Sequence, residues 1–240
     1  YYIVCGLQLD EKGATEMAKT FIALDNHLAH TQMVSFYLGE YYYQRKAYND
    51  ALAYYAKCNI ANLNNRQIAT MKFHQAYAYF VNKDFAKSKP LFNAIRQLPE
   101  DPNYVDANYY YGFLAFNDQA YETAIESFLI AESHPDYQNV VPFYLTELYY
   151  FSGNREKALS YGELAIKRNG QYYDLQLKQL VGHLLFEKRA FDRALPYLEA
   201  YVAASEKVRR EDLYELSYCY YEAKNWSKAI QGFKQIGGSL

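Results

Sequence analysis

The sequence predicts an all-α protein built from stacked antiparallel helical hairpins. Two columns of small side chains recur along the chain at spacings of 33 to 37 residues. The first column consists of Gly6, Gly39, Ala76, Gly112, Thr146, Gly182 and Ser217. The second lies twelve residues further on in every case and consists of Ala18, Ala51, Ser88, Ala124, Ala158, Ala194 and Ala229. Because small side chains let two helices pack closely, each pair predicts a hairpin of a first helix, A, and a second helix, B. The polar–apolar alternation typical of strands is missing.

Two columns of large side chains support the same register. Nine residues after the first column lie Tyr48, Phe85, Tyr121, Phe191 and Trp226, with exceptions at Thr15 and Arg155. Sixteen residues after it lie Ile22, Tyr55, Phe92, Phe128, Leu198 and Phe233, with an exception at Gly162. We expect the aromatic residue of the nine-residue column to begin helix B and to fill the hairpin interior.

Six complete repeats follow a partial one in this register. The predicted ranges are 1–31 for the partial repeat, then 32–68, 69–104, 105–138, 139–174, 175–209 and 210–240. In order, the A–B junctions are the short polar segments QRKAY, VNKDF, NDQAY, SGNRE, EKRAF and EAKNW. Short connections predict antiparallel neighbours. Pro99 and Pro135 are expected to end B helices, because proline cannot continue a helix.

A period near 34 residues with this pattern of small and aromatic positions resembles the tetratricopeptide repeat (TPR) family. The resemblance covers almost the whole chain and implies a right-handed superhelix. The fourth repeat departs from the pattern at Thr146, Arg155 and Gly162, so a looser or differently tilted hairpin is expected there. The 29 tyrosines resemble the Tyr-rich TPR arrays of bacteria, which implies a cell-envelope or periplasmic location. Neither end resembles a capping repeat, so we expect a segment of a longer array, or ends that self-associate or dock elsewhere.

Composition excludes several classes of function. The formal net charge is −2 and lysine and arginine are not clustered, which argues against nucleic-acid binding. No apolar run is long enough for a membrane span. The three cysteines lie far apart in the sequence and suggest no disulfide framework. The chain carries no signal peptide or other targeting segment, so the sequence leaves the compartment open.

The TPR resemblance implies a concave groove lined by positions two, five, nine and twelve of each repeat, counted from the predicted repeat start. Fourteen of these twenty-four positions are Phe or Tyr, and none is Lys or Arg. The carboxylate clamp of chaperone adaptors needs Lys, Asn and Arg there and is therefore absent. An aromatic, mildly acidic groove suits an apolar or amphipathic segment with basic residues. The candidate partner-binding residues are Phe36, Tyr43, Phe73, Tyr77, Tyr109, Phe113, Phe143, Glu147, Tyr150 and Tyr214. The alternative is that these aromatic residues are structural and pack against the neighbouring repeat.

Candidate chemistry in the sequence is sparse. His27 and His30, with Asp25 nearby, form a conceivable zinc site without a full ligand set, and we expect them at the end of a B helix. Phosphate-binding glycine loops and nucleophile motifs are missing. Neither catalysis, a metal nor a cofactor is therefore expected.

Three functions remain open. The first is a scaffold that binds a partner segment in its groove. The second is a structural spacer of a larger envelope or secretion protein, with the groove filled by the protein's own flanking segments. The third is a receptor that stacks carbohydrate on tyrosine, which ranks last because TPR grooves far more often bind peptides.

Overall fold

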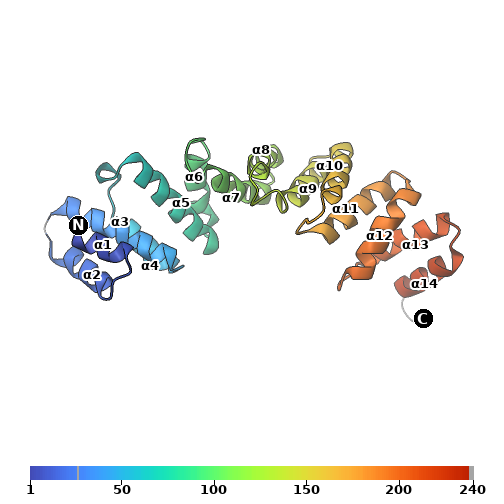
Figure 1. Ribbon diagram of the computed structural model, residues 1–240. Helices are drawn as coiled ribbons and strands as arrows, with labels where there is room; N and C mark the ends of the chain where they lie inside the picture. The colour runs from blue at the N-terminus through green and yellow to red at the C-terminus, as the bar shows by residue number, and fades with distance from the viewer. Residues whose placement is uncertain (26, 238–240) are drawn as a thin grey trace. The chain divides into compact units, whose positions relative to one another are not determined.

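The computed structural model describes residues 1–25 and 27–237, and within them the secondary structure is helical (Figure 1). The A helices are α1 (Tyr2–Gln8), α3 (Leu28–Gln44), α5 (Asn65–Val81), α7 (Tyr104–Asn117), α9 (Val141–Phe151), α11 (Asp174–Glu187) and α13 (Arg210–Glu222). The B helices are α2 (Ala14–Leu24), α4 (Tyr48–Tyr55), α6 (Phe85–Ile95), α8 (Tyr121–Glu132), α10 (Arg155–Lys167), α12 (Phe191–Ala204) and α14 (Trp226–Gly237). A short 3₁₀ helix, η1 (Ile60–Asn62), lies between α4 and α5. The helices form two compact units, Tyr1–Leu114 and Ala115–Leu240.

Four of the six predicted repeat starts lie within two residues of the first residue of an A helix. The other two A helices, α3 and α5, begin four residues earlier than the predicted starts Gln32 and Ala69. For α5 the reason is a capping box, in which the Asn64 side chain accepts from the Gln67 amide and the Gln67 side chain accepts from the Asn64 amide.

The two small columns lie inside the hairpins. All fourteen of their residues are buried. A Cβ atom added to Gly39 would lie 2.6 Å from the ring of Tyr55, and one added to Gly182 would lie 2.8 Å from the side chain of Leu198. The large residue of the sixteen-residue column therefore packs directly on the backbone of helix A, which requires a small residue at that point.

In the fourth repeat, helices A and B also pack closely at this point, but the small residue and the larger residue of the contact have exchanged helices. Thr146 is fully buried on α9, and a Cβ atom on Gly162 of α10 would lie 3.1 Å from its methyl group. The larger side chain is thus on helix A and the glycine on helix B. The guanidinium of Arg155, which replaces the usual aromatic residue, lies 5.0 Å from the ring centre of Tyr150. These contacts fill the positions at which the fourth repeat departs from the pattern. The expectation of a looser or differently tilted hairpin stays a prediction.

The aromatic residues of the nine-residue column begin α4, α6, α8, α12 and α14, as expected. Each ring contacts the aromatic residue five positions earlier at the end of helix A, for example Phe186 with Phe191 and Tyr221 with Trp226. Phe85 and Trp226 are 39% and 52% exposed. The expectation that this column fills the hairpin interior was therefore wrong for these two, whose rings lie partly in solvent at the turn.

In each A–B turn, the second residue after helix A lies in the left-handed backbone region, and the turn between α1 and α2 has a further such residue, Gly13. The residues at the second position are Asp10, Lys46, Lys83, Gln119, Gly153, Arg189 and Lys224. The following amide donates to a carbonyl five residues back, as from Ala47 to Tyr42 at 3.0 Å. This is a Schellman arrangement, which satisfies carbonyls at the end of helix A. Gly153 is the one glycine among the seven, so residue type does little to mark these turns in the sequence.

Ala120→Asn is expected to raise the free energy of unfolding by about 1 kcal/mol, because it adds a missing N-cap. Ala120 precedes α8 with φ −82° and ψ 68° and offers no side-chain cap. Asn154 precedes α10 with nearly the same backbone, φ −87° and ψ 66°, and its side chain accepts from the Lys157 amide at 3.1 Å. Urea unfolding measures the change, and Asn154→Ala should lose a similar amount. Unchanged stability in both variants would mean that solvent already satisfies these amides.

Candidate functional site

The predicted groove residues of the first unit fall into two groups. Phe36 and Phe73 are only 4% and 6% exposed and belong to the core. Phe36 packs with Leu63, which comes from the connection between α4 and α5, and Phe73 packs edge-on against Phe92 of α6. Little of either ring is therefore open to a partner, although Phe36 reaches a small pocket of about 130 Å³ beside Tyr37 and Glu40.

The remaining predicted residues of this unit are partly exposed. Tyr43 stacks on His74 with ring centres 3.7 Å apart, and Tyr77 meets Tyr43 edge-on at 6.0 Å. Burial raises the pKa of the Tyr43 hydroxyl above its ordinary value. Tyr109 and Phe113 contact each other edge-on at 5.0 Å on α7. These rings form a semi-buried aromatic surface on α3, α5 and α7.

A polar cluster lies beneath this aromatic surface. Glu40 accepts a hydrogen bond from the Tyr55 hydroxyl at 2.5 Å, and its Oε1 lies 2.8 Å from Nδ1 of His74. Burial in the first place, with the Glu40 carboxylate adding to it, raises the pKa of Tyr55. A glutamate of α3 is therefore paired with a histidine of the next A helix, α5.

In the second unit, three predicted residues line one pocket. Phe143, Glu147 and Tyr150 of α9 share a pocket of about 550 Å³ with side chains of α11 and α13 and with Arg209, which immediately precedes α13. Seven of its lining residues were expected to face the groove: Phe143, Glu147, Tyr150, Gln176, Gln179, His183 and Glu211. The other lining residues are Phe151, Leu180, Arg209 and Glu215. Tyr214, the tenth candidate, is not among the lining residues; it is 47% exposed and contacts Tyr218 and Phe233.

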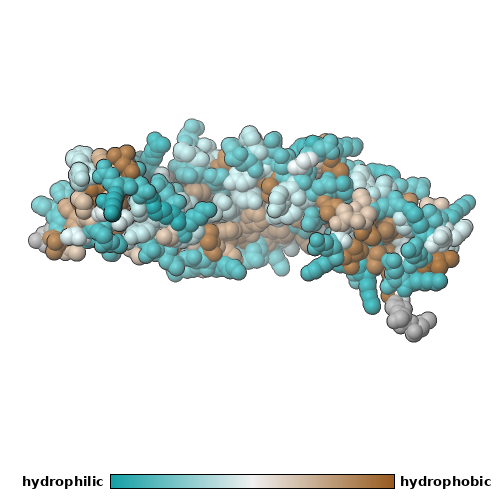
Figure 2. Space-filling model, turned by 60° about the horizontal axis from the view of Figure 1, so that its bottom comes forward, coloured by the Kyte–Doolittle hydropathy of each residue, from teal (hydrophilic) through white to brown (hydrophobic). Residues whose placement is uncertain are grey.

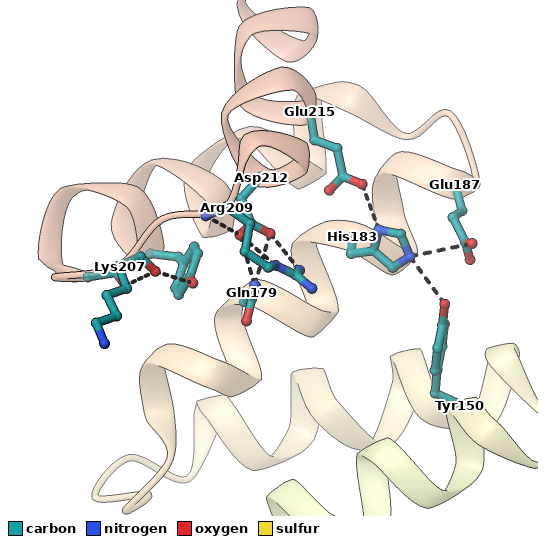
Figure 3. A network of polar contacts seen from close by, with 10 residues as sticks. Tyr150, Gln179, His183, Glu187, Lys207, Arg209, Asp212 and Glu215 are labelled. Carbon is teal, nitrogen blue, oxygen red and sulfur yellow. Dashed lines mark hydrogen bonds and ion pairs between the residues drawn. The ribbon is translucent and has the colours of Figure 1, made fainter. Parts of the chain in front are cut away.

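His183 is at the centre of the polar contacts of this pocket (Figure 3). Its Nδ1 lies 2.7 Å from Oε1 of Glu215, and its Nε2 lies 3.4 Å from Glu187 and 3.3 Å from the Tyr150 hydroxyl. The hydrogen bond with Glu215 is the main reason that the pKa of His183 is raised, and burial opposes it. His183 thus has a carboxylate at each of its ring nitrogens.

Arg209 is likewise held by a carboxylate. Its guanidinium donates two hydrogen bonds to Asp212, at 2.8 and 3.0 Å, and Asp212 also accepts from the Gln179 amide nitrogen at 2.9 Å (Figure 3). Burial would raise the pKa of Asp212, but the bonds from Arg209 and Gln179 outweigh it and hold that pKa below its usual value. The two basic side chains at the pocket are thus already paired.

Two carboxylate groups in the pocket have acceptor capacity that is not used. Glu147 makes no hydrogen bond or ion pair within the described residues, and burial raises its pKa to about 7. Oε2 of Glu215 is buried and has no hydrogen-bond partner among those residues, although Oε1 is bound to His183.

Glu215 and Leu180 were missed because they occupy the sixth position of their repeats, counted from the predicted starts 210 and 175, which was not among the predicted groove positions. A signal for Glu215 does exist. Glu40 and His183 occupy the ninth position, and their partners His74 and Glu215 occupy the sixth position of the next repeat. Opposite charges at this offset would have predicted both pairs.

The histidines considered for zinc lie elsewhere than expected. His27 immediately precedes α3 and His30 is in its first turn, whereas α2 ends at Leu24. The expected position at the end of a B helix was wrong. His30 lies 3.8 Å from Asp25, and no group of three or more potential metal-ligating side chains occurs within residues 1–25 and 27–237. None of the helices described there is both long and apolar enough to cross a membrane.

On the face shown in Figure 2, apolar side chains form separate patches among hydrophilic ones. Individual large apolar side chains are exposed on both helix types, such as Phe151 and Tyr221 on A helices and Leu164 on a B helix. Exposed apolar side chains alone therefore do not distinguish the pocket from the rest of the surface. Its hollow shape and its polar groups distinguish it.

A comparison with protein families identifies the repeats. The family model described as tetratricopeptide repeat matches residues 182–236, which run from α11 to α14. This segment of the chain is similar to the tetratricopeptide repeat family. TPR proteins are generally non-catalytic scaffolds that bind protein or peptide partners, and no curated protein sequence matches this chain.

Solved structures extend the TPR fold to the rest of the chain. The C-terminal part of a TPR repeat-containing protein from Cytophaga hutchinsonii is 15% identical with a TM-score of 0.62, and the match covers 98% of this chain and 93% of that one. Pseudomonas aeruginosa pilF is 17% identical with a TM-score of 0.60, covering 87% and 93%. YrrB, described as a TPR protein with an unusual peptide-binding site, is 17% identical with a TM-score of 0.55, covering 70% and 84%.

Proposed function

We propose that this TPR array is a non-catalytic scaffold that binds a segment of a partner protein on the surface of its A helices. Each unit has a candidate surface of its own: Tyr43, Tyr77, Tyr109 and Phe113 in the first unit, and Phe143, Glu147, Tyr150 and Tyr214 in the second. Phe36 and Phe73 are left out because their side chains are buried. The peptide-binding site of YrrB, which has the same fold, supports a peptide ligand.

The observation that carries the proposal is the pocket on α9, α11 and α13. Its volume of about 550 Å³ suits one or two side chains. Phe143, Tyr150 and Phe151 supply apolar area for an anchor, and the side-chain amides of Gln176 and Gln179 can bind backbone groups of an extended segment. The described lining residues include no serine, threonine or cysteine that His183 could activate as a nucleophile, which favours binding over catalysis.

A dodecapeptide library displayed on phage and selected on the whole chain tests this function. Peptides selected on the wild type should bind the Phe143→Ala/Tyr150→Ala variant at least ten-fold more weakly, because buried aromatic anchors contribute about 2 kcal/mol each. The matched control is Leu129→Ala/Leu164→Ala, which removes exposed apolar side chains from the B helices α8 and α10. Circular dichroism verifies that both variants remain folded.

The outcomes separate the candidate functions. Loss of binding in the A-helix variant alone supports the scaffold. Unchanged binding in both variants would mean that the selected peptides bind outside this pocket. No enrichment of any peptide on the wild type would contradict the proposal and favour the structural spacer with its groove filled in cis.

A further inference from the structure

Neighbouring A helices pair their charged side chains at a fixed offset. The ninth position of one repeat faces the sixth position of the next. Glu40 on α3 pairs with His74 on α5 at 2.8 Å, and His183 on α11 pairs with Glu215 on α13 at 2.7 Å. The acid is on the earlier helix in the first pair and on the later helix in the second.

Glu147 occupies the same ninth position on α9, but its counterpart at the sixth position of α11 is Leu180. Leucine cannot donate a hydrogen bond, which explains why this carboxyl lacks the partner that Glu40 and Glu215 have. Burial without a partner raises the pKa of Glu147 to about 7. A partly buried carboxylate left in this state has unused capacity for a cation.

Glu215 of α13 lines the same pocket and adds negative charge beneath its surface. Glu215 is 8% exposed, and its Oε2 has no hydrogen-bond partner in the described part of the chain, while Oε1 binds His183. In Figure 3 this second oxygen points away from His183. Gln179 donates its amide hydrogens to Asp212, which leaves its side-chain oxygen as a further acceptor.

The basic side chains at the pocket do not cancel these acceptors. Arg209 is bound to Asp212, and His183 lies between Glu215 and Glu187. Glu211 adds an exposed carboxylate at the pocket edge. Charge complementarity therefore favours a cationic occupant.

The aromatic rings of the pocket favour a flat cation. Phe143 and Phe151 line it, and the guanidinium of Arg155 already lies over the ring of Tyr150. Guanidinium groups stack on aromatic faces and present several donors in one plane, so they suit acceptors on different helices better than an ammonium does.

We propose that the pocket on α9, α11 and α13 binds an arginine side chain of the partner segment, with the Glu147 carboxylate as the charged acceptor and Phe143 and Phe151 as stacking surfaces. This inference rests on the proposed peptide-binding function and assigns the chemistry of its anchor. We attribute the preference for arginine to Glu147 in particular, because Leu180, the residue at the sixth position of the next repeat, is apolar and cannot bind this carboxylate.

The test selects the same dodecapeptide phage library on the wild type, on Glu147→Gln and on Glu126→Gln. Glu126 is an exposed glutamate of α8, so its variant controls for the change in net charge. Wild type and Glu126→Gln should enrich peptides with arginine at a fixed position, and Glu147→Gln should lose that enrichment. A selected peptide is then synthesised with arginine, lysine or citrulline, which has the shape of arginine without its charge.

For the wild type we expect the citrulline peptide to bind at least ten-fold more weakly than the arginine peptide, and the lysine peptide to lie between them. On Glu147→Gln the difference between arginine and citrulline should fall below about three-fold. Selected peptides without arginine, or an arginine preference that is unchanged in Glu147→Gln, would overturn the inference and leave peptide binding intact. If no peptide is enriched on the wild type, the proposed function itself fails, and the arginine site fails with it.

Discussion

Gly182→Ala is expected to destabilise the wild type by about 2 kcal/mol and to stabilise the Leu198→Ala variant by about 1 kcal/mol. In the wild type the added Cβ would lie 2.8 Å from Cγ and Cδ2 of Leu198, a side chain that is fully buried and cannot move away freely. In Leu198→Ala those atoms are gone. The new methyl group then fills part of the cavity, and alanine also favours the helix more than glycine does. Leu198→Ala alone should cost about 3 kcal/mol.

A double-mutant cycle measured by urea unfolding provides the test. The coupling between the two positions should be about 3 kcal/mol, since they are in direct contact. Gly39→Ala, in a hairpin of the other unit, is the control: its cost should be the same with or without Leu198→Ala. Additive effects of Gly182→Ala and Leu198→Ala would show that the close approach of α11 and α12 is not what requires the glycine.

Glu147→Gln is expected to raise the free energy of unfolding by about 2 kcal/mol at pH 8 and to leave it nearly unchanged at pH 4.5. Burial raises the pKa of this carboxyl from 4.5 to about 7 in the folded chain. The folded state therefore holds the proton more tightly than the unfolded state, and stability falls as the pH rises from 4.5 through about 7. The full shift corresponds to about 3 kcal/mol, and solvent screening of a partly exposed group reduces it.

The measurement is the difference in unfolding free energy between the variant and the wild type at several pH values. Taking the difference removes the contribution of His183, which titrates in both proteins. Glu126→Gln, at an exposed carboxyl, should show no such pH dependence. A difference that is constant between pH 4.5 and pH 8 would mean that Glu147 is solvated in the folded protein.

Together with the arginine proposal, this result would describe a carboxylate that destabilises the free protein and binds a cation in the complex. A bound guanidinium would favour the ionised form of Glu147 and lower its pKa. The affinity for an arginine-containing segment and the stability of the free protein therefore both depend on whether Glu147 is protonated.

The sequence alone determined the hairpin register. The two small columns, with Gly39 and Gly182 as examples, mark where helices A and B touch, and the aromatic column marks the first residue of most B helices. These features are visible because each depends on contacts inside one repeat, at a fixed separation along the chain. The columns also show the exchange at Thr146 and Gly162, because a larger residue stands in the small column and a glycine stands in the column of large side chains sixteen residues further on.

Only the tertiary structure decided which groove positions are available to a partner. Phe36 and Phe73 share a helical position with Tyr109 and Phe143, yet the first two are buried because Leu63 and Phe92 cover them. The charge pairs, and the absence of one at Glu147 within the described residues, likewise depend on which residue of the next A helix lies opposite. The charge pairs are contacts between repeats and are set by the stacking offset of neighbouring hairpins, which no spacing within a single repeat specifies. Leu63 and Phe92 belong to the same repeats as Phe36 and Phe73, so the burial of these rings depends instead on how the segment after α4 and helix α6 pack against helix A.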